Sequence, residues 1–208
     1  MNNFYNVIIT IFTSIISMGM VQYDTQEQKQ ALQFPLDKLQ QGDIAFRRGE
    51  GFISEVVVYN DAHGMYSHIG IIVKHNDSLK VVHAVPGEPD FKGDFDRVKL
   101  EPIESFYSPS RASKGEIMRI PLSDSMRNII NNIALEKAHQ KIKFDHDYNV
   151  NDTTKLYCTE LIQLLFSHID IDLAENRSTV INIPGASGNY IMPSDIYRNE
   201  KLISVYKY

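Results

Sequence analysis

The only cysteine of the 208-residue chain is the residue on which its chemistry would depend. Cys158 lies at the predicted first turn of a helix that we expect over residues 156–168. There, unpaired backbone N–H groups and the positive end of the helix dipole favour the thiolate, the form of cysteine that acts as a nucleophile. Cysteine also fills core space as a small hydrophobic residue, so its position alone leaves both interpretations open.

A thiol nucleophile needs a base within hydrogen-bonding reach, and two of the seven histidines are the best candidates for that role. His68 and His83 lie in the two β-rich segments that flank a turn at residues 75–78. This turn pairs position 72 with position 81, which places His83 diagonally from His68 on one face of a hairpin. The other histidines lie in predicted loops or near helix ends, where contact with solvent explains them.

A metal ion is the rival explanation for the two histidines. His68 and His83, with Asp145 or His146, could converge on zinc, but the sequence has no His-x-x-x-His or His-Glu-x-x-His spacing. We therefore expect neither a metal nor any other cofactor. Gly-x-Ser-x-Gly and a glycine-rich phosphate loop are also absent, so serine-hydrolase and nucleotide-dependent chemistry are not expected.

The N-terminal segment is predicted to direct the chain to a membrane. The first 23 residues contain no Asp, Glu, Lys or Arg, and the run from Phe4 to Met20 is rich in Ile, Val, Phe and Met. Small residues near its end have the spacing of a signal-peptidase site, so residues 1–20 are predicted to be a signal peptide or an uncleaved N-terminal anchor. A buried core helix is a third alternative. We expect a secreted, periplasmic or cell-envelope protein, close to the membrane through this segment.

The elements that must position the cysteine and the histidines indicate one α+β domain. A linker or short helix at 21–35 precedes a domain over residues 36–208, with a mainly antiparallel sheet or partial barrel packed against helices. We predict strands at 44–46, 67–73, 79–85, 98–100, 116–120 and 202–206, and helices at 52–59, 124–139, 156–168 and 193–198. The net charge of −5 and the absence of a clustered basic segment argue against a nucleic-acid partner.

Short motifs occur along the chain in a fixed order: Gly42-Asp43-Ile44, Ser67-His68-Ile69-Gly70, Val82-His83-Ala84-Val85-Pro86-Gly87, Phe144-Asp145, Tyr157-Cys158-Thr159-Glu160-Leu161 and Pro193-Ser194-Asp195. Together they resemble the YiiX-like permuted papain-fold amidases of the wider NlpC/P60 superfamily. The resemblance spans residues 36–206. In the permuted branch the histidine strands precede the cysteine helix, which is the order found here, and the nucleophile lies at a helix N-terminus.

The resemblance implies that Cys158 is the nucleophile, His68 the general base and His83 the residue that orients it. Many YiiX-like proteins are expected to have an acidic residue at the third position, whereas histidine is usual in unpermuted NlpC/P60 proteins. A neutral His83 fixes the tautomer of His68 but does not offset an imidazolium charge as a carboxylate would. Glu160 is either a structural acid of the family or a first-turn glutamate favoured by the helix dipole.

The reaction implied is acyl transfer through a thioacyl-enzyme, in a secreted cysteine hydrolase that cleaves amide bonds, for example in cell-wall peptides. The backbone N–H of Cys158 is the natural first oxyanion donor. Tyr157, Tyr66 and Tyr107 are candidates to contact the substrate, the first two as a second oxyanion donor. Two alternatives stay open: an acyltransferase or lipase-like enzyme that acts on acylated lipids, and a non-catalytic binding module on the same fold.

Overall fold

A tight hairpin between β2 (His68–His75) and β3 (Ser78–Val85) lies at the centre of the fold and carries both predicted histidines. Its turn, Asn76-Asp77, has positive φ at both residues, the backbone conformation that a two-residue hairpin turn requires. Asn and Asp tolerate that conformation better than most residues. Ile72 pairs with Val81, so the register predicted from the sequence is confirmed.

The computed structural model describes residues 34–148, 152, 154–181 and 187–208, which belong to one unit, Gln33–Tyr208. The predicted signal peptide or anchor lies outside the described residues. Within the described part, no helix is both long enough and apolar enough to cross a membrane.

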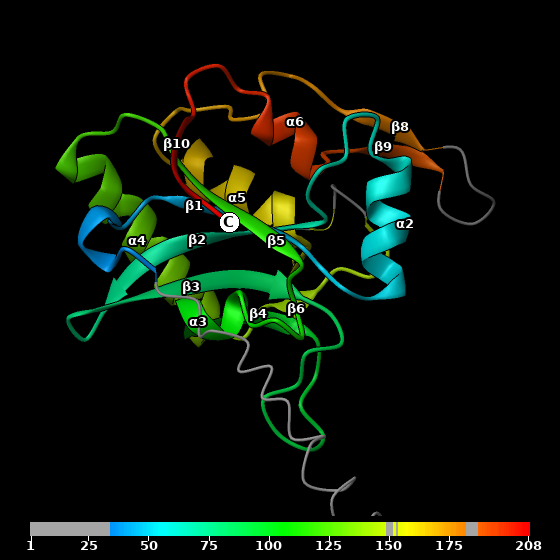
Figure 1. The fold of residues 1–208 in the computed structure, drawn as a ribbon, viewed down its shortest axis with the longest axis horizontal. Helices are drawn as coiled ribbons and strands as arrows, with labels where there is room; N and C mark the ends of the chain where they lie inside the picture. The colour runs from blue at the N-terminus through cyan, green and yellow to red at the C-terminus, as the bar shows by residue number, and fades with distance from the viewer. Residues whose placement is uncertain (1–33, 149–151, 153, 182–186) are drawn as a thin grey trace, which may run out of the picture. The chain divides into compact units, whose positions relative to one another are not determined.

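The strands of the described part form an eight-stranded sheet in the order β10-β5-β1-β2-β3-β4-β6-β7 (Figure 1). Besides β2 and β3, its strands are β1 (Ile44–Arg48), β4 (Arg97–Pro102), β5 (Lys114–Arg119), β6 (Lys143–Phe144), β7 (Lys155–Leu156) and β10 (Ile203–Lys207). Neighbouring strands are antiparallel, except that β6 and β7 are parallel. The short strands β8 (Thr179–Ile181) and β9 (Gly188–Tyr190) form a separate antiparallel pair. The prediction of an α+β protein with a mainly antiparallel sheet is confirmed.

The helical segments follow the predicted positions, with two short additions. They are η1 (Leu36–Lys38), α2 (Phe52–Asn60), α3 (Ile103–Phe106), α4 (Asp124–His139), α5 (Cys158–Ser167) and α6 (Pro193–Tyr197). The start of α4 is set by Ser123, whose hydroxyl oxygen accepts a hydrogen bond from the backbone N–H of Met126 at 3.3 Å. The sequence did not indicate η1 or α3, because a single turn is too short to have a hydrophobic period.

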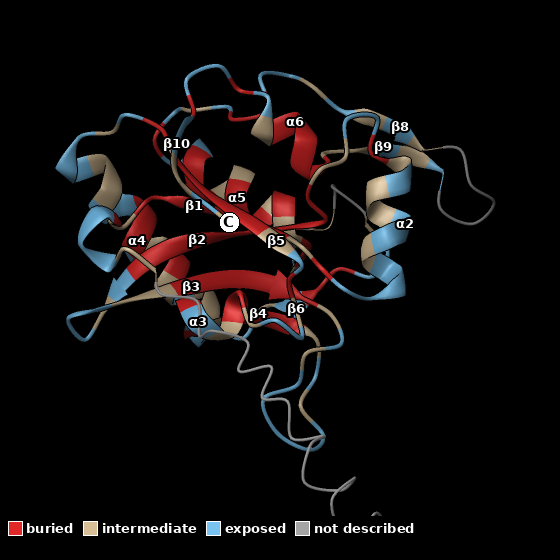
Figure 2. Cartoon of the chain, viewed as in Figure 1, coloured by how far each residue is buried: buried red, intermediate tan, exposed pale blue. Residues whose placement is uncertain are grey.

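Each face of the central strands has its own core, because successive side chains of a strand point to opposite faces. On one face, Ile69 and Ile71 pack in the same cluster as Leu161 of α5. On the other face, Ile72 packs in a cluster with Phe106 at the end of α3. Figure 2 shows this burial along β2, β3 and α5, whereas α2 has no buried residue.

The hairpin is tightest at Gly70, and we predict that Gly70→Ala destabilises the protein. A Cβ atom there would lie 2.6 Å from Val81 Cγ1 and 3.2 Å from His83 Cβ, so the two strands would have to move apart. The expected loss is about 1 to 3 kcal/mol in the free energy of unfolding, measured by urea denaturation. Gly51→Ala is the control, because no atom lies within 4 Å of its Cβ position. Equal losses in the two variants would contradict this packing argument.

Candidate active site

Cys158 is the first residue of α5, where the sequence places it. The side-chain cap of this helix comes from its own first turn. Tyr157 is the N-cap residue, and the Glu160 carboxylate accepts a hydrogen bond from its backbone N–H at 3.1 Å. Asp152 instead accepts a hydrogen bond from the backbone N–H of Thr154, which holds a turn before the helix. Glu160 therefore helps to fix the helix start, and burial raises the pKa of its carboxyl to about 7.

Two opposing effects act on the sulfur of Cys158. Burial raises the pKa of the thiol to about 11, and it outweighs the backbone N–H groups of Ile69 and Thr159 and the charge of Arg47, which lower it. The helix start thus lowers the pKa of the thiol, as expected from the sequence, but the opposite effect of burial is larger. The thiol is protonated at neutral pH.

The structure brings His68 and His83 together, as the hairpin register predicts. His68 Nε2 lies 2.8 Å from His83 Nδ1, a hydrogen-bonding distance, and both side chains are buried. Phe106 packs against both rings, with centroid distances of 5.7 and 5.1 Å. Burial lowers the pKa of both imidazoles; for His68 the charge of Arg47 lowers it further, and for His83 burial outweighs Glu101, which raises it. Both histidines are therefore neutral in the resting protein.

Cys158 and His68 lie close in the fold, because α5 packs against β2 and the Cys158 sulfur approaches the N–H of Ile69, the residue after His68. Within the described residues, the thiol forms no hydrogen bond with the His68 ring. Such contacts are often long in a free enzyme and shorten when substrate binds. Since His68 Nε2 contacts His83, its Nδ1 is the nitrogen left for a thiol proton.

Glu101 is a member of this cluster that the sequence reasoning missed. Its Oε1 lies 2.8 Å from His83 Nε2, a contact that lacks the alignment of a good hydrogen bond and becomes an ion pair only when His83 is protonated. Burial alone would raise the pKa of the Glu101 carboxyl, but His83, Lys99 and Arg111 together lower it to about 2. The sequence of β4 contained a usable signal, because charged residues alternate along it. Buried Lys99 and Glu101 on one face of a strand need charged or polar partners, which indicates a polar cluster there.

Cations hold the carboxylates around His83. Glu101 Oε2 lies 2.7 Å from Arg111 NH1 and 3.4 Å from Lys99 Nζ. Glu88 contacts Arg47, and its other oxygen lies 3.2 Å from Arg111 NH1. Every carboxylate in this group therefore has a positively charged partner.

A metal ion does not fit this cluster. One ligand atom each from His83, Glu88 and Glu101 lies within 4.8 Å of the others, which resembles a three-ligand site. Three cations already contact the two carboxylates, so a divalent ion would add positive charge to a buried group whose charges are already compensated. We derive no step through a metal.

The zinc set considered from the sequence does not form among the described residues. His146 Nε2 lies 3.0 Å from Asp96 and is largely exposed, whereas His68 and His83 are buried against each other. Asp145 is buried next to the start of α5, where its backbone N–H donates to Leu156.

The three tyrosines predicted to contact the substrate are all buried, and each has a hydrogen-bond partner within the fold. The Tyr66 hydroxyl donates to Glu116 at 2.8 Å, so it is not free to serve as an oxyanion donor. Tyr107 packs in the second core and donates to the backbone of Glu116, and it does not line an open groove. Tyr157 is the N-cap residue of α5, and its hydroxyl accepts from the Ile191 N–H at 3.4 Å.

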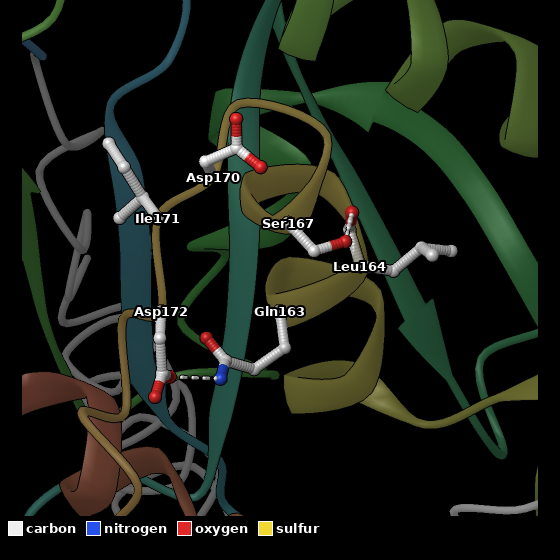
Figure 3. A pocket seen from close by; sticks show the side chains of 6 residues that line it. All are labelled: Gln163, Leu164, Ser167, Asp170, Ile171 and Asp172. Atoms are coloured by element: carbon white, nitrogen blue, oxygen red, sulfur yellow. Dashed lines mark hydrogen bonds between the residues drawn. The ribbon is translucent and has the colours of Figure 1, made fainter.

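A surface hollow at the other end of α5 is separate from the cysteine. It is lined by Gln163, Leu164, Ser167, Asp170, Ile171 and Asp172 (Figure 3). Gln163 and Asp172 are joined there by a hydrogen bond of 2.8 Å. The first helix residue that lines the hollow is Gln163, which lies about 8 Å further along the helix than Cys158.

Fold and site together define a class: an α+β protein in which a cysteine begins a buried helix beside a pair of strand histidines. A solved structure, that of the metalloprotein yiiX from Escherichia coli O157:H7, is similar with a TM-score of 0.67 and 18% sequence identity. The match covers 82% of this chain and 98% of that one. No family model and no curated protein matches the sequence. The chain therefore has a YiiX-like fold.

The two buried histidines make the stability depend on pH. Because their folded-state pKa lies below the ordinary 6.5, the unfolded chain binds more protons than the folded chain just below pH 6.5. The free energy of unfolding is thus highest above that pH and falls as the pH drops below it. Replacing one histidine by His83→Gln should flatten the dependence by up to about 1.4 kcal/mol per pH unit, measured by urea denaturation.

His139→Gln is the matched control, because His139 is exposed at the end of α4. It should leave the pH dependence as in the unchanged protein. A His83→Gln variant with an unaltered slope would show that His83 is protonated in the folded state.

Proposed function

We propose that this protein is a cysteine hydrolase that cleaves amide bonds through a thioacyl-enzyme. Cys158 is the nucleophile, His68 the general base and His83 the residue that orients His68. One observation carries the proposal: a partly buried thiol at the start of α5 approaches the backbone of β2 next to two neutral histidines that contact each other at 2.8 Å. Burying two imidazoles against each other destabilises the folded protein, and a hairpin with a purely structural role would not need them.

The neutral resting state determines the first step. His68 Nδ1 takes the proton from the Cys158 thiol as the sulfur attacks the carbonyl carbon, so the S–H bond breaks while the S–C bond forms. For Nδ1 to accept, His68 must carry its own proton on Nε2 and donate it to His83 Nδ1. His83 thereby selects the tautomer of His68 that acts as a base.

The later steps return the proton. The protonated His68 donates to the leaving amine as the C–N bond breaks, which leaves a thioester on Cys158. Water then attacks this thioester, His68 accepts the water proton, and the acid is released with the thiol restored. The backbone N–H of Cys158 is the donor at hand for the oxyanion of both tetrahedral intermediates.

The substrate we favour is a peptide amide of the cell envelope. This choice follows from the predicted N-terminal export or anchor segment and from the family resemblance, and it places the protein outside the cytoplasm or at the envelope. Neither a nucleic-acid partner nor a cofactor is part of the proposal.

An acyltransferase or lipase-like activity on acylated lipids is the second candidate, and helix α2 favours it. Phe52 and Tyr59 on this helix are 81% and 88% exposed, and Ile53 is also exposed. The helix connects β1 to β2, the strand that begins with His68, and the Gly49 N–H donates to the Ser67 hydroxyl at 2.9 Å beneath it. An acyl chain on α2 would therefore lie near the strand ends that carry the site.

The test is the product formed by purified protein from peptidoglycan fragments, and from acylated lipids in a parallel assay, analysed by mass spectrometry. We expect amide cleavage that is lost in Cys158→Ala and reduced at least about 100-fold in His68→Ala, the usual contribution of a general base. His139→Ala should retain full activity.

The same assays separate the alternatives. A lipid-derived acyl adduct on Cys158, without cleavage of the peptide, would replace the first candidate by the second. Absence of any Cys158-dependent product, with a thiol whose reactivity does not depend on His68, would favour a non-catalytic binding module.

A further inference from the structure

We propose that Glu101 is a positioning residue for the reaction, the terminal member of a chain that runs from Cys158 through His68 and His83 to a buried carboxylate. This inference rests on the proposed function. Glu101 supplies the negative charge that His83 does not provide. In a Cys-His-acid triad the carboxylate contacts the base directly, whereas here His83 lies between His68 and the carboxylate.

The sheet itself fixes the contact between His83 and Glu101. His83 of β3 pairs with Lys99 of β4, and Glu101 lies two residues further along β4, on the same face. Diagonal neighbours in paired strands are within reach of long side chains, and here Nε2 and Oε1 lie 2.8 Å apart. A contact between two paired strands is held more rigidly than one made by a loop.

Other charged groups hold Glu101 in one orientation. Its Oε2 is 2.7 Å from Arg111 NH1 and 3.4 Å from Lys99 Nζ, which leaves Oε1 for His83. Lys99 is itself held by Asp90 at 2.7 Å. The carboxylate is thus both ionised and aimed at the imidazole.

The charged groups that face His83 come from every neighbouring element. They are His68 on β2, Arg47 on β1, Lys99 and Glu101 on β4, Glu88 after β3, and Arg111 after α3. Glu88 and Arg47 contact each other, whereas Glu101 alone places an oxygen against His83 Nε2. The effect of Glu101 should therefore exceed that of Glu88.

Glu101 acts when the thiol proton moves. Once His68 has accepted that proton, a positive charge lies on the pair of buried imidazoles, where water does not screen it. The carboxylate at 2.8 Å from His83 stabilises this charge, and it stays ionised because its pKa is about 2. No bond is made or broken at Glu101.

The measurement is the rate at which iodoacetamide alkylates Cys158 as a function of pH, which needs no knowledge of the substrate. In the unchanged protein the alkylation rate should be independent of pH near neutrality. At lower pH, where His68 and His83 become protonated, the rate should fall; this fall is the acid limb of the profile. Glu101→Gln keeps an acceptor for His83 but removes the charge. This variant should lower the pH-independent alkylation rate about tenfold and move the acid limb to lower pH by about one unit, the usual effect of losing one nearby opposite charge.

Two further variants separate this role from a loss of folding. Glu88→Gln removes a carboxylate from the same cluster without touching His83, and it should shift the limb by less than half as much. Arg111→Gln removes a cation that competes with His83 for Glu101, and it should move the limb to higher pH. A folding defect would not produce shifts in opposite directions, and Glu101→Asp should restore part of the rate.

Each result has a definite meaning. Equal shifts in Glu101→Gln and Glu88→Gln, or an unshifted limb in Arg111→Gln, would overturn the role of Glu101 while leaving the proposed function intact. His68→Ala tests that function separately, since an alkylation profile identical to the unchanged protein would overturn it. Stoichiometric binding of zinc by the Cys158→Ala protein, lost in both glutamine variants, would show that the cluster is a metal site instead.

Discussion

The burial of two imidazoles against each other is the constraint on which the rest of the site depends. A buried histidine needs a partner for each ring nitrogen, because an unpaired polar atom in the core is costly. The hairpin provides a partner for His68 Nε2 and His83 Nδ1 by setting the two rings diagonally, and β4 places the Glu101 carboxylate 2.8 Å from His83 Nε2. What remains is Nδ1 of His68, whose neighbour Ile69 has its backbone N–H near the Cys158 sulfur. The same register that builds the sheet thus leaves one basic nitrogen for chemistry.

Burial also explains why Cys158 is an uncharged thiol at rest although the proposed mechanism uses it as a nucleophile. The same environment raises the pKa of Cys158 and lowers the pKa of His68, so the neutral pair is favoured until a substrate arrives. This arrangement protects the single cysteine, because a protonated thiol is slow to be oxidised or alkylated. The N–H of Ile69 and the start of α5 then stabilise the negative charge on sulfur when the proton leaves.

Much of the fold could be predicted from the sequence, and the reasons are local. The hairpin register followed from the turn at residues 75–78, and the predicted helix at 124–139 agrees with α4. The approach of His68 to His83 then followed from the period of a strand. In contrast, η1 and α3 are single turns, and β6 and β7 are two residues each, so no periodicity marks them.

The parts of the site that could not be predicted depend on contacts between segments far apart in the chain. Glu101 approaches His83 only because β3 and β4 pair in one register, and Arg111 reaches Glu101 from a loop. Tyr66 was expected as a second oxyanion donor and Tyr107 as a substrate contact, but both side chains are buried and donate hydrogen bonds to Glu116. The sign of the thiol pKa shift also depends on burial, which a helix position does not reveal.

The proposed mechanism requires two histidines that are neutral at rest and share one hydrogen bond that selects the basic tautomer of His68. Nitrogen NMR of the imidazole rings, with signals assigned through His68→Gln and His83→Gln, measures this directly. We predict two neutral rings at pH 7, with the proton of His68 on Nε2 and that of His83 on the nitrogen that faces Glu101. A charged imidazolium at that pH, or a His68 proton on Nδ1, would contradict the account.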